Sequence, residues 1–373
     1  MSDAAKLPKG RWHLFAVLLL FGALAHAYPE NIRHGYVNCT SCHVSPTGGG
    51  ALTPYGRGLS SELMSTWSYK NEEGFLHGAI KEEQMPEWLM IGGDVRVGQT
   101  YNDTPTFTEK RLIWMQEDFE VAVKHKQVTL DLEFGHIEDP GRERWGSRRY
   151  FAMLNLTDEV TARVGRFYPQ FGINVADHYV PTRATLGFQE GQERDNAELA
   201  WNGENWSAFA TVSQQPGEIP QSSREKSGAL QLNRNIADSS KVGASVWYGT
   251  SDVASRKMLG LHALAGFTKR LFLLSEVDHQ WLTAKATDAE TRGIYMYSRL
   301  GYEITKGLIA FGQAEYTQSD LTRGGGERDA YGPGLQWFPR PHFELVATWR
   351  KLRTRTQGTA FGDYGFLLGH YYF

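Results

Sequence analysis

Apolar and polar residues alternate with a period of two along much of the chain after residue 87. Residues 128–134 read Val-Thr-Leu-Asp-Leu-Glu-Phe, and the same alternation recurs in residues 242–248 and 343–349. Because successive side chains of a strand point to opposite faces, this pattern predicts strands with one apolar face and one polar or mixed face.

The pattern predicts sixteen strands, and the connections between them alternate in length. The strands are expected near residues 88–101, 110–124, 127–137, 147–156, 159–168, 194–202, 205–213, 227–236, 240–250, 255–268, 271–283, 291–304, 308–319, 328–338, 342–353 and 361–373. Even-numbered connections are tight, as at 202–205, 305–307 and 338–341. Odd-numbered connections are longer and polar, as at 138–146, 169–193, 214–226, 284–290 and 320–327.

This parity of loop lengths is typical of outer-membrane barrels, which have short periplasmic turns and longer extracellular loops. We therefore predict an all-β fold for residues 87–373, a transmembrane antiparallel β-barrel of about 16 strands in contact with outer-membrane lipid. The chain ends on Phe373, as terminal barrel strands often do, and 13% aromatic residues suit two interfacial girdles. An even strand count places both mature termini in the periplasm. A soluble all-β protein is the alternative.

The first 27 residues have the organisation of a signal peptide. Lys6, Lys9 and Arg11 precede an apolar run from Leu14 to Ala25, and Ala25-His26-Ala27 resembles a cleavage site. An uncleaved membrane anchor is the alternative, although the apolar run is short for a span. Export to the bacterial outer membrane is therefore expected. The net charge of −3 does not favour binding of the negatively charged nucleic acids, so nucleic acid is not expected as a partner.

Residues 28–86 contain the most specific motif, Cys39-Thr40-Ser41-Cys42-His43. This C-x-x-C-H pattern attaches c-type haem, with Cys39 and Cys42 bonded to the porphyrin and His43 as an axial ligand of its iron. A redox dithiol, half of a zinc site and a plain disulfide are the alternatives. No other cysteine is present to complete a four-thiolate zinc site. We therefore expect one covalent haem c in this segment.

The other residues of a haem site are less specific. His77 or Met64 is a candidate distal ligand, His34 and Met85 also lie in the segment, and an open sixth position is a further possibility. Tyr55 and Arg57 are candidate contacts for a haem propionate, or else turn residues. Three consecutive glycines at 48–50 predict a loop that passes close to a flat ring. The segment has too little apolar material for a core of its own and needs haem or an enclosing domain.

The longest predicted connection, residues 169–193, carries Asp177, His178, Glu190 and Glu193. Folded inward, it would narrow a pore or bind a cation through carboxylate and imidazole groups. We expect instead a solvated surface loop.

Residues 34–60 are similar to the haem segment of the fused monohaem cytochrome–porins of the bacterial outer membrane. The likeness is carried by Cys39-Thr40-Ser41-Cys42-His43 and by Leu52-Thr53-Pro54-Tyr55-Gly56-Arg57. Members of that family are known from iron-oxidising bacteria. The resemblance implies a haem on Cys39, Cys42 and His43, placed in the barrel lumen or at its periplasmic mouth. The barrel itself offers no motif that matches the family.

Two functions compete. The first is electron transfer by the haem between a periplasmic carrier, a soluble cytochrome for example, and an extracellular donor or acceptor such as Fe(II). Asp131 and Glu133 would attract cations if they face the lumen. The second is a diffusion or substrate-selective porin with a small N-terminal plug, in which haem is structural or absent. Peroxide reduction is a third and weaker option. No hydrolase or nucleotide-enzyme motif is present.

Overall fold

A computed structural model describes residues 29–373 apart from 140–141, 178, 190, 325–326 and 356–359. The predicted signal peptide, His178 and Glu190 lie outside the described residues.

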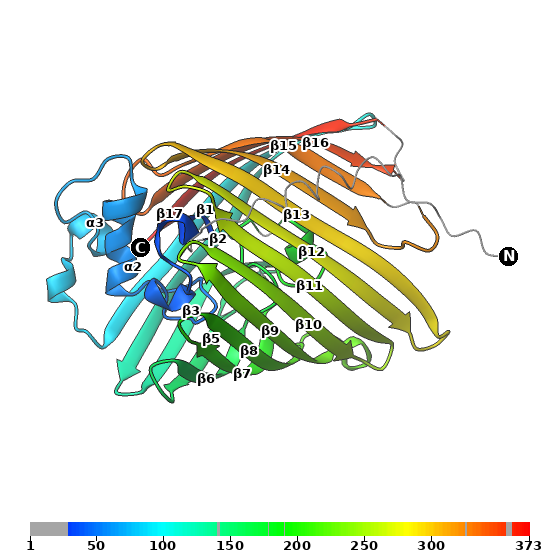
Figure 1. The fold of residues 1–373 in the computed structure, drawn as a ribbon, viewed down its shortest axis with the longest axis horizontal. Coiled ribbons are helices and arrows are strands. Elements are labelled where there is room, and N and C mark those ends of the chain that lie inside the picture. Colours follow the sequence, from blue (N-terminus) through cyan, green and yellow to red (C-terminus); the bar gives the residue numbers. More distant parts are fainter. Residues whose placement is uncertain (1–28, 140–141, 178, 190, 325–326, 356–359) are drawn as a thin grey trace.

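The described residues form a closed antiparallel β-barrel with the strands in sequence order (Figure 1). The strands are β1 Leu89–Asp103, β2 Thr108–His125, β3 Val128–Asp139, β4 Arg142–Gly146, β5 Tyr150–Asn155, β6 Val160–Phe167, β7 Arg194–Asn202, β8 Trp206–Gln214, β9 Lys226–Ala237, β10 Ser240–Thr250, β11 Ala254–Gly266, β12 Leu271–Ala284, β13 Ala289–Thr305, β14 Leu308–Gln318, β15 Arg328–Trp337, β16 Phe343–Thr354 and β17 Gly362–Tyr372. Pairing of β1 with β17, from Asp94 with Tyr372 to Asp103 with Asp363, closes the barrel.

The barrel has sixteen strand positions, because β4 and β5 pair with different stretches of the same strand, β3. The strand predicted at 147–156 begins only at Tyr150, and β4 lies within the stretch predicted as the connection 138–146. The connection expected at 284–290 is also shorter, since β12 and β13 continue as a hairpin and leave only 285–288 between them. The predicted fold class is otherwise confirmed.

The alternation of side chains gives the barrel an apolar outside and a polar inside. Leu130 on β3 is 56% exposed, whereas the next residue, Asp131, is 4% exposed. Exposed aromatic side chains lie toward both ends of the strands: Trp201, Trp206, Tyr302 and Phe343 near the tight turns, and Trp145, Tyr248 and Tyr331 toward the other end. An apolar belt between aromatic girdles is the exterior of a membrane-spanning barrel. Asp131 and Glu133 point inward, as their alternation with the outward leucines predicts.

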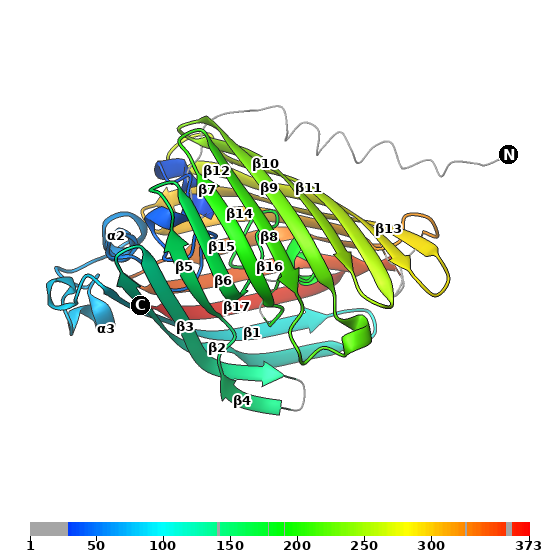
Figure 2. The same ribbon diagram turned by 90° about the horizontal axis from the view of Figure 1, so that it is seen from below.

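The N-terminal segment lies at and inside the tight-turn end of the barrel, near the C-terminus (Figures 1 and 2). It contains the 3-10 helices η1 (Pro29–His34), η2 (Cys39–Ser41) and η4 (Glu82–Gln84), helix α2 (Pro54–Leu59), the π-helical turn η3 (Ser60–Met64) and helix α3 (Phe75–Gly78). Hydrogen bonds from the backbone of Thr66 and Trp67 to the carbonyls of Phe338 and Pro339 hold it on the tight turns. These polar contacts with the barrel wall thus add to the small apolar core of the N-terminal segment.

The connection between β6 and β7 folds into the lumen, so the expectation of a solvated surface loop is wrong. Phe171 packs on Phe188 of the same loop and on Trp247 of the wall. Val180 and Leu186 of the loop are fully buried. The loop contains α4 (Pro181–Ala184). The loop folds inward because this removes its apolar side chains from water. Among the described residues, no helix is long and apolar enough to cross a membrane.

Candidate functional site

Cys39, Cys42 and His43 are brought together by one helical turn. The backbone N–H groups of Cys42 and His43 donate to the carbonyl of Cys39 at 3.1 and 3.0 Å. Positions three and four residues apart then lie on one side of the turn. Both cysteines are free thiols in this structure. The motif therefore presents two thiols and one imidazole to the same space, as covalent haem attachment requires.

Glycines form the surface against which the motif packs. Gly48, Gly49 and Gly50 have φ angles of +80°, +74° and +68°, a region that favours glycine. A Cβ on Gly48 would lie 3.3 Å from Cys39 Sγ, and one on Gly56 would lie 2.2 Å from the Cys42 carbonyl oxygen. A side chain at residue 56 would therefore collide with the Cys42 backbone, and one at residue 48 would crowd the Cys39 thiol.

Burial sets the protonation of the motif. It raises the pKa of the Cys42 thiol to about 11 and also raises the pKa of Cys39. A redox dithiol of the thioredoxin kind needs the opposite shift, toward thiolate. Burial lowers the pKa of His43, partly offset by the carbonyls of Gly50 and Gly49. His43 is therefore neutral at pH 7, the form in which imidazole binds a metal.

The motif faces a cavity between the N-terminal segment, the inward loop and the barrel wall. Counting the part that opens to solvent, the space amounts to about 2020 Å³. Cys39, Cys42, His43 and all three glycines line it, together with Phe188 and Ile173 of the loop. The wall contributes polar residues: Asp94, Arg96, Gln116, Glu133, Gln231, Asn233, Lys241, His262 and His370.

The candidate distal ligands separate in the structure. Met64 lines the cavity and is buried in an apolar cluster with Ile32 and Ile173. His77 lies in α3, where its ring stacks on Tyr371 and Phe343, and it does not line the cavity. His34 and Met85 are not among the lining residues either.

Tyr55 and Arg57 lie in α2, outside the cavity lining. Tyr55 is 56% exposed, and its hydroxyl is 2.7 Å from that of Tyr36. Arg57 is buried and donates from Nη2 to the carbonyl of Ile91 at 3.1 Å. Their contact with a haem propionate stays a prediction.

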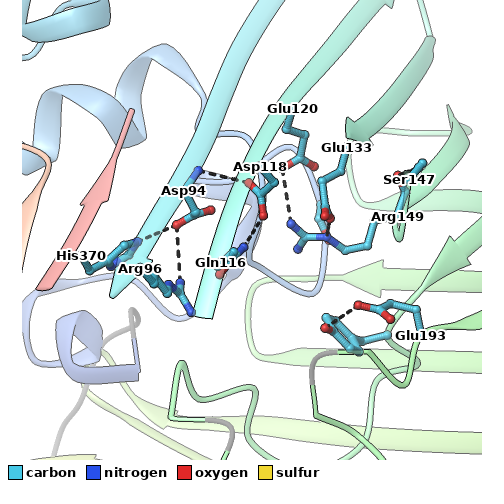
Figure 3. Close-up of polar contacts among 12 residues, drawn as sticks. Asp94, Arg96, Gln116, Asp118, Glu120, Glu133, Ser147, Arg149, Glu193 and His370 are labelled. Carbon is cyan, nitrogen blue, oxygen red and sulfur yellow. Dashed lines mark hydrogen bonds and ion pairs between the residues drawn. The ribbon is translucent and has the colours of Figure 1, made fainter. Parts of the chain in front are cut away.

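The wall beside the cavity is a network of carboxylates held by cations and amides (Figure 3). Arg149 lies between Glu133, to which its Nε donates, and Glu120, whose Oε2 is 3.6 Å from its Nη2. Asp94 Oδ1 is 2.6 Å from His370 Nε2 and 3.5 Å from Arg96 Nη2. Glu133, Glu120 and Asp94 are therefore each paired with a cation.

The described residues of the inward loop form no metal centre. Glu193 accepts from the Tyr168 hydroxyl at 2.6 Å, and Asp177 lies 3.4 Å from Arg299. In the part of the chain that the structure describes, no group of three or more His, Cys, Asp or Glu side chains is arranged to hold an ion. His178 and Glu190 are not described.

Sequence reasoning missed three residues beside the motif: Arg149, Lys241 and His262. Lys241 donates from Nζ to the carbonyl of Val37, just before the motif. Lys241 and His262 are polar residues of predicted strands, and the polar positions of such strands are expected to face the lumen. Nothing in the sequence indicates which lumen residues face residue 39, because that depends on strand register and on the path of the N-terminal segment.

The residues present fit a covalent haem. The two free thiols and the half-buried His43 imidazole face one cavity, and the Nδ1 atom of His43 is itself buried without a hydrogen-bond partner. The glycine surface leaves room beside Cys39, and apolar side chains of the inward loop supply the rest of the lining.

Comparison with models of known protein families and with the sequences of curated proteins gives no match. Solved structures, in contrast, are similar in fold. OmpT, an outer membrane protein of Vibrio cholerae, matches with a TM-score of 0.61 at 8% identity, over 78% of this chain and 99% of that chain.

Two further barrels match at similar levels. An anion-selective porin from Comamonas acidovorans has a TM-score of 0.59 at 9% identity, over 76% of this chain and 99% of the porin. The outer membrane channel DcaP of Acinetobacter baumannii has 0.56 at 10% identity, over 76% and 97%. At this identity the likeness shows the fold, that of a porin-like outer-membrane barrel, and does not extend to a cofactor.

Proposed function

We propose that this chain is an electron-transfer protein of the bacterial outer membrane, with one haem c bound to Cys39, Cys42 and His43 inside a porin-like barrel. The observation that carries the proposal is that both thiols and the imidazole face the lumen cavity at the tight-turn end. When bound, the haem supplies reversible one-electron chemistry. A periplasmic carrier would approach the tight-turn end, and an extracellular reductant such as Fe(II) the other.

The barrel residues hold the motif in place. Arg163 of β6 donates to Ser45 Oγ at 2.9 Å and to Thr47 Oγ1 at 3.0 Å, while its Nε donates to Glu198 at 2.8 Å. Asn174 of the inward loop donates to the Thr47 carbonyl at 3.0 Å. These bonds fix the residues that follow His43, so the motif keeps one orientation in the lumen.

The second candidate is a diffusion or substrate-selective porin, which the shared fold with porins favours. The N-terminal segment and the inward loop lie inside the lumen, which argues against free diffusion of solutes through the barrel. The N-terminal segment is tied to the wall by buried ion pairs, including Arg33 with Glu303 at 3.2 Å and Arg299 with Glu30 at 3.6 Å. A chain serving only as a channel would not need its two free thiols beside a neutral imidazole at that position.

Purified outer-membrane protein separates the two functions. We expect the mass of the polypeptide to include one covalent porphyrin, and a pyridine haemochrome spectrum to report it. A variant with Cys39→Ala and Cys42→Ala should keep the folded barrel in detergent and lose the spectrum and electron transfer. Flux of small solutes through the wild-type protein in liposomes, with no porphyrin mass, would instead establish the porin.

Carriers and donors are tested by reduction kinetics. Purified protein with haem should be reduced by Fe(II) applied outside proteoliposomes and oxidised by a soluble cytochrome enclosed within them. Reduction by the cytochrome alone, with no response to Fe(II), would keep electron transfer and exclude iron as the donor.

A further inference from the structure

His262 of β11 is a buried imidazole whose hydrogen bonds fix its tautomer. Its Nε2 is 2.9 Å from Asn233 Oδ1 on β9. That oxygen also accepts from Gln231 Nε2 at 3.1 Å, while Asn233 Nδ2 donates to Ser207 Oγ at 3.0 Å. Asn233 Oδ1 is therefore the acceptor, and His262 carries its proton on Nε2.

The other ring nitrogen, Nδ1, then has a lone pair with nothing to bind. His262 is 5% exposed, and its Nδ1 is buried without a hydrogen-bond partner. Buried polar atoms in proteins are almost always paired, so an unpaired acceptor calls for an explanation. His262 lines the cavity that Cys39, Cys42 and His43 also line.

The barrel is shaped to hold the ring in this position. Gly243 of β10 is paired with Asn233 on one side and with His262 on the other. A Cβ at Gly243 would lie 2.3 Å from both Asn233 Oδ1 and His262 Nε2. The hydrogen bond between Asn233 and His262 therefore passes over β10 only because residue 243 is glycine. Helix η1 also packs against β11, which keeps the N-terminal segment beside this strand.

This arrangement is that of a metal-binding histidine. Such histidines donate their second ring N–H to an oxygen acceptor, which fixes the ring and increases its basicity. The two histidines come from different parts of the chain: His43 belongs to the N-terminal segment, and His262 belongs to the barrel wall. A ligand from each would join the segment to the barrel through the iron.

We propose that His262 is the second axial ligand of the haem iron, bound through Nδ1, with Asn233 as the positioning residue. The inference rests on the proposed function, because it requires the haem held by Cys39, Cys42 and His43. Among the residues named as distal candidates from the sequence, Met64 is the one that shares the cavity, and it is the competing ligand.

Electronic and electron paramagnetic resonance spectra of the ferric protein test this assignment. The wild type should show low-spin iron with the signature of two histidine ligands. His262→Ala and His262→Gln should keep the covalent haem by mass and become high-spin, with added imidazole restoring the low-spin form of His262→Ala. The glutamine variant fills the same space and can still donate to Asn233, so it separates ligation from packing.

Two matched variants complete the experiment. His279→Ala removes a histidine of β12 that lies against Trp281, outside the cavity, and should leave the spectrum unchanged. Met64→Leu should do the same. A methionine signature in the wild type that Met64→Leu abolishes would overturn the proposal, as would a high-spin wild type. Absence of porphyrin mass in the wild type would instead refute the proposed function itself.

Discussion

Arg33 in η1 and Glu303 in β13 form an ion pair at 3.2 Å, with less than a tenth of either side chain exposed. Residues at opposite ends of the sequence are thus joined inside the barrel. Glu303 also accepts from the backbone N–H of Gly307 in the tight turn, at 3.0 Å. The pair therefore connects the N-terminal segment directly to the tight-turn end of the wall.

Arg33→Ala should loosen the N-terminal segment while leaving the barrel intact. Removing one partner of a buried ion pair leaves an uncompensated charge and costs about 3–5 kcal/mol. Limited proteolysis should then cut within residues 29–86 faster than in the wild type, with the barrel still resistant. Arg292→Ala is the control, because its pair with Glu290 is largely exposed. Equal cleavage of both variants would mean that the Arg33 pair does not anchor the segment.

Glu30 predicts a pH dependence of stability. Burial raises its pKa to about 7, with Arg299 lowering and Glu344 raising the value, and one carboxylate oxygen has no hydrogen-bond partner. The folded protein therefore binds the Glu30 proton more tightly than the unfolded chain does. This contribution to stability is complete below the ordinary pKa near 4.5 and is lost as pH rises through about 7.

Thermal unfolding in detergent, measured between pH 4.5 and 8, checks this dependence. We expect the melting temperature of the wild type, relative to that of Glu30→Gln, to fall as pH increases across this interval. A constant difference between the two proteins over the whole range would show that Glu30 does not titrate in the folded barrel.

Gly48→Ala and Gly49→Ala form a matched pair that tests the surface beside Cys39. Both positions have positive φ, so both substitutions bear a similar backbone cost of about 1–2 kcal/mol. Only at residue 48 would the new methyl group approach Cys39 Sγ, at 3.3 Å, whereas the nearest atom to a methyl at 49 is Arg149 Nη1 at 3.5 Å. Haem staining per barrel should decrease more for Gly48→Ala. Equal staining would mean that the space beside Cys39 is not needed.

Arg149→Gln should lower the reduction potential of the haem. Arg149 lines the cavity and compensates Glu120 and Glu133, so its loss leaves negative charge that stabilises the ferric state. We expect a shift of roughly tens of millivolts, where about 59 mV is a tenfold change in a one-electron equilibrium. Redox titration measures it. Arg149→Lys keeps the charge and should remain near the wild type, and a matching decrease in both variants would point to geometry instead of charge.

The sequence by itself determined the barrel. Alternation such as that of Leu130 and Asp131 depends only on the two-residue period of a strand, and lipid outside and water inside select one register for each strand. The lengths of the connections then predict the orientation of the strands in the membrane, and the spacing of Cys39, Cys42 and His43 predicts haem attachment; both stay predictions. These are local features, so they can be predicted without contacts between distant residues.

The tertiary structure alone decided what faces the motif. The inward path of residues 169–193 follows from burial of Phe171 and Leu186 on the wall, which local polarity did not indicate. His77 and Met64 are equally plausible in sequence, yet only Met64 reaches the cavity, and His262 reaches it from a strand more than two hundred residues away in the chain. Closure of β1 on β17 and the register of each strand set these neighbours, because a shift of one residue would turn a lumen side chain toward the lipid.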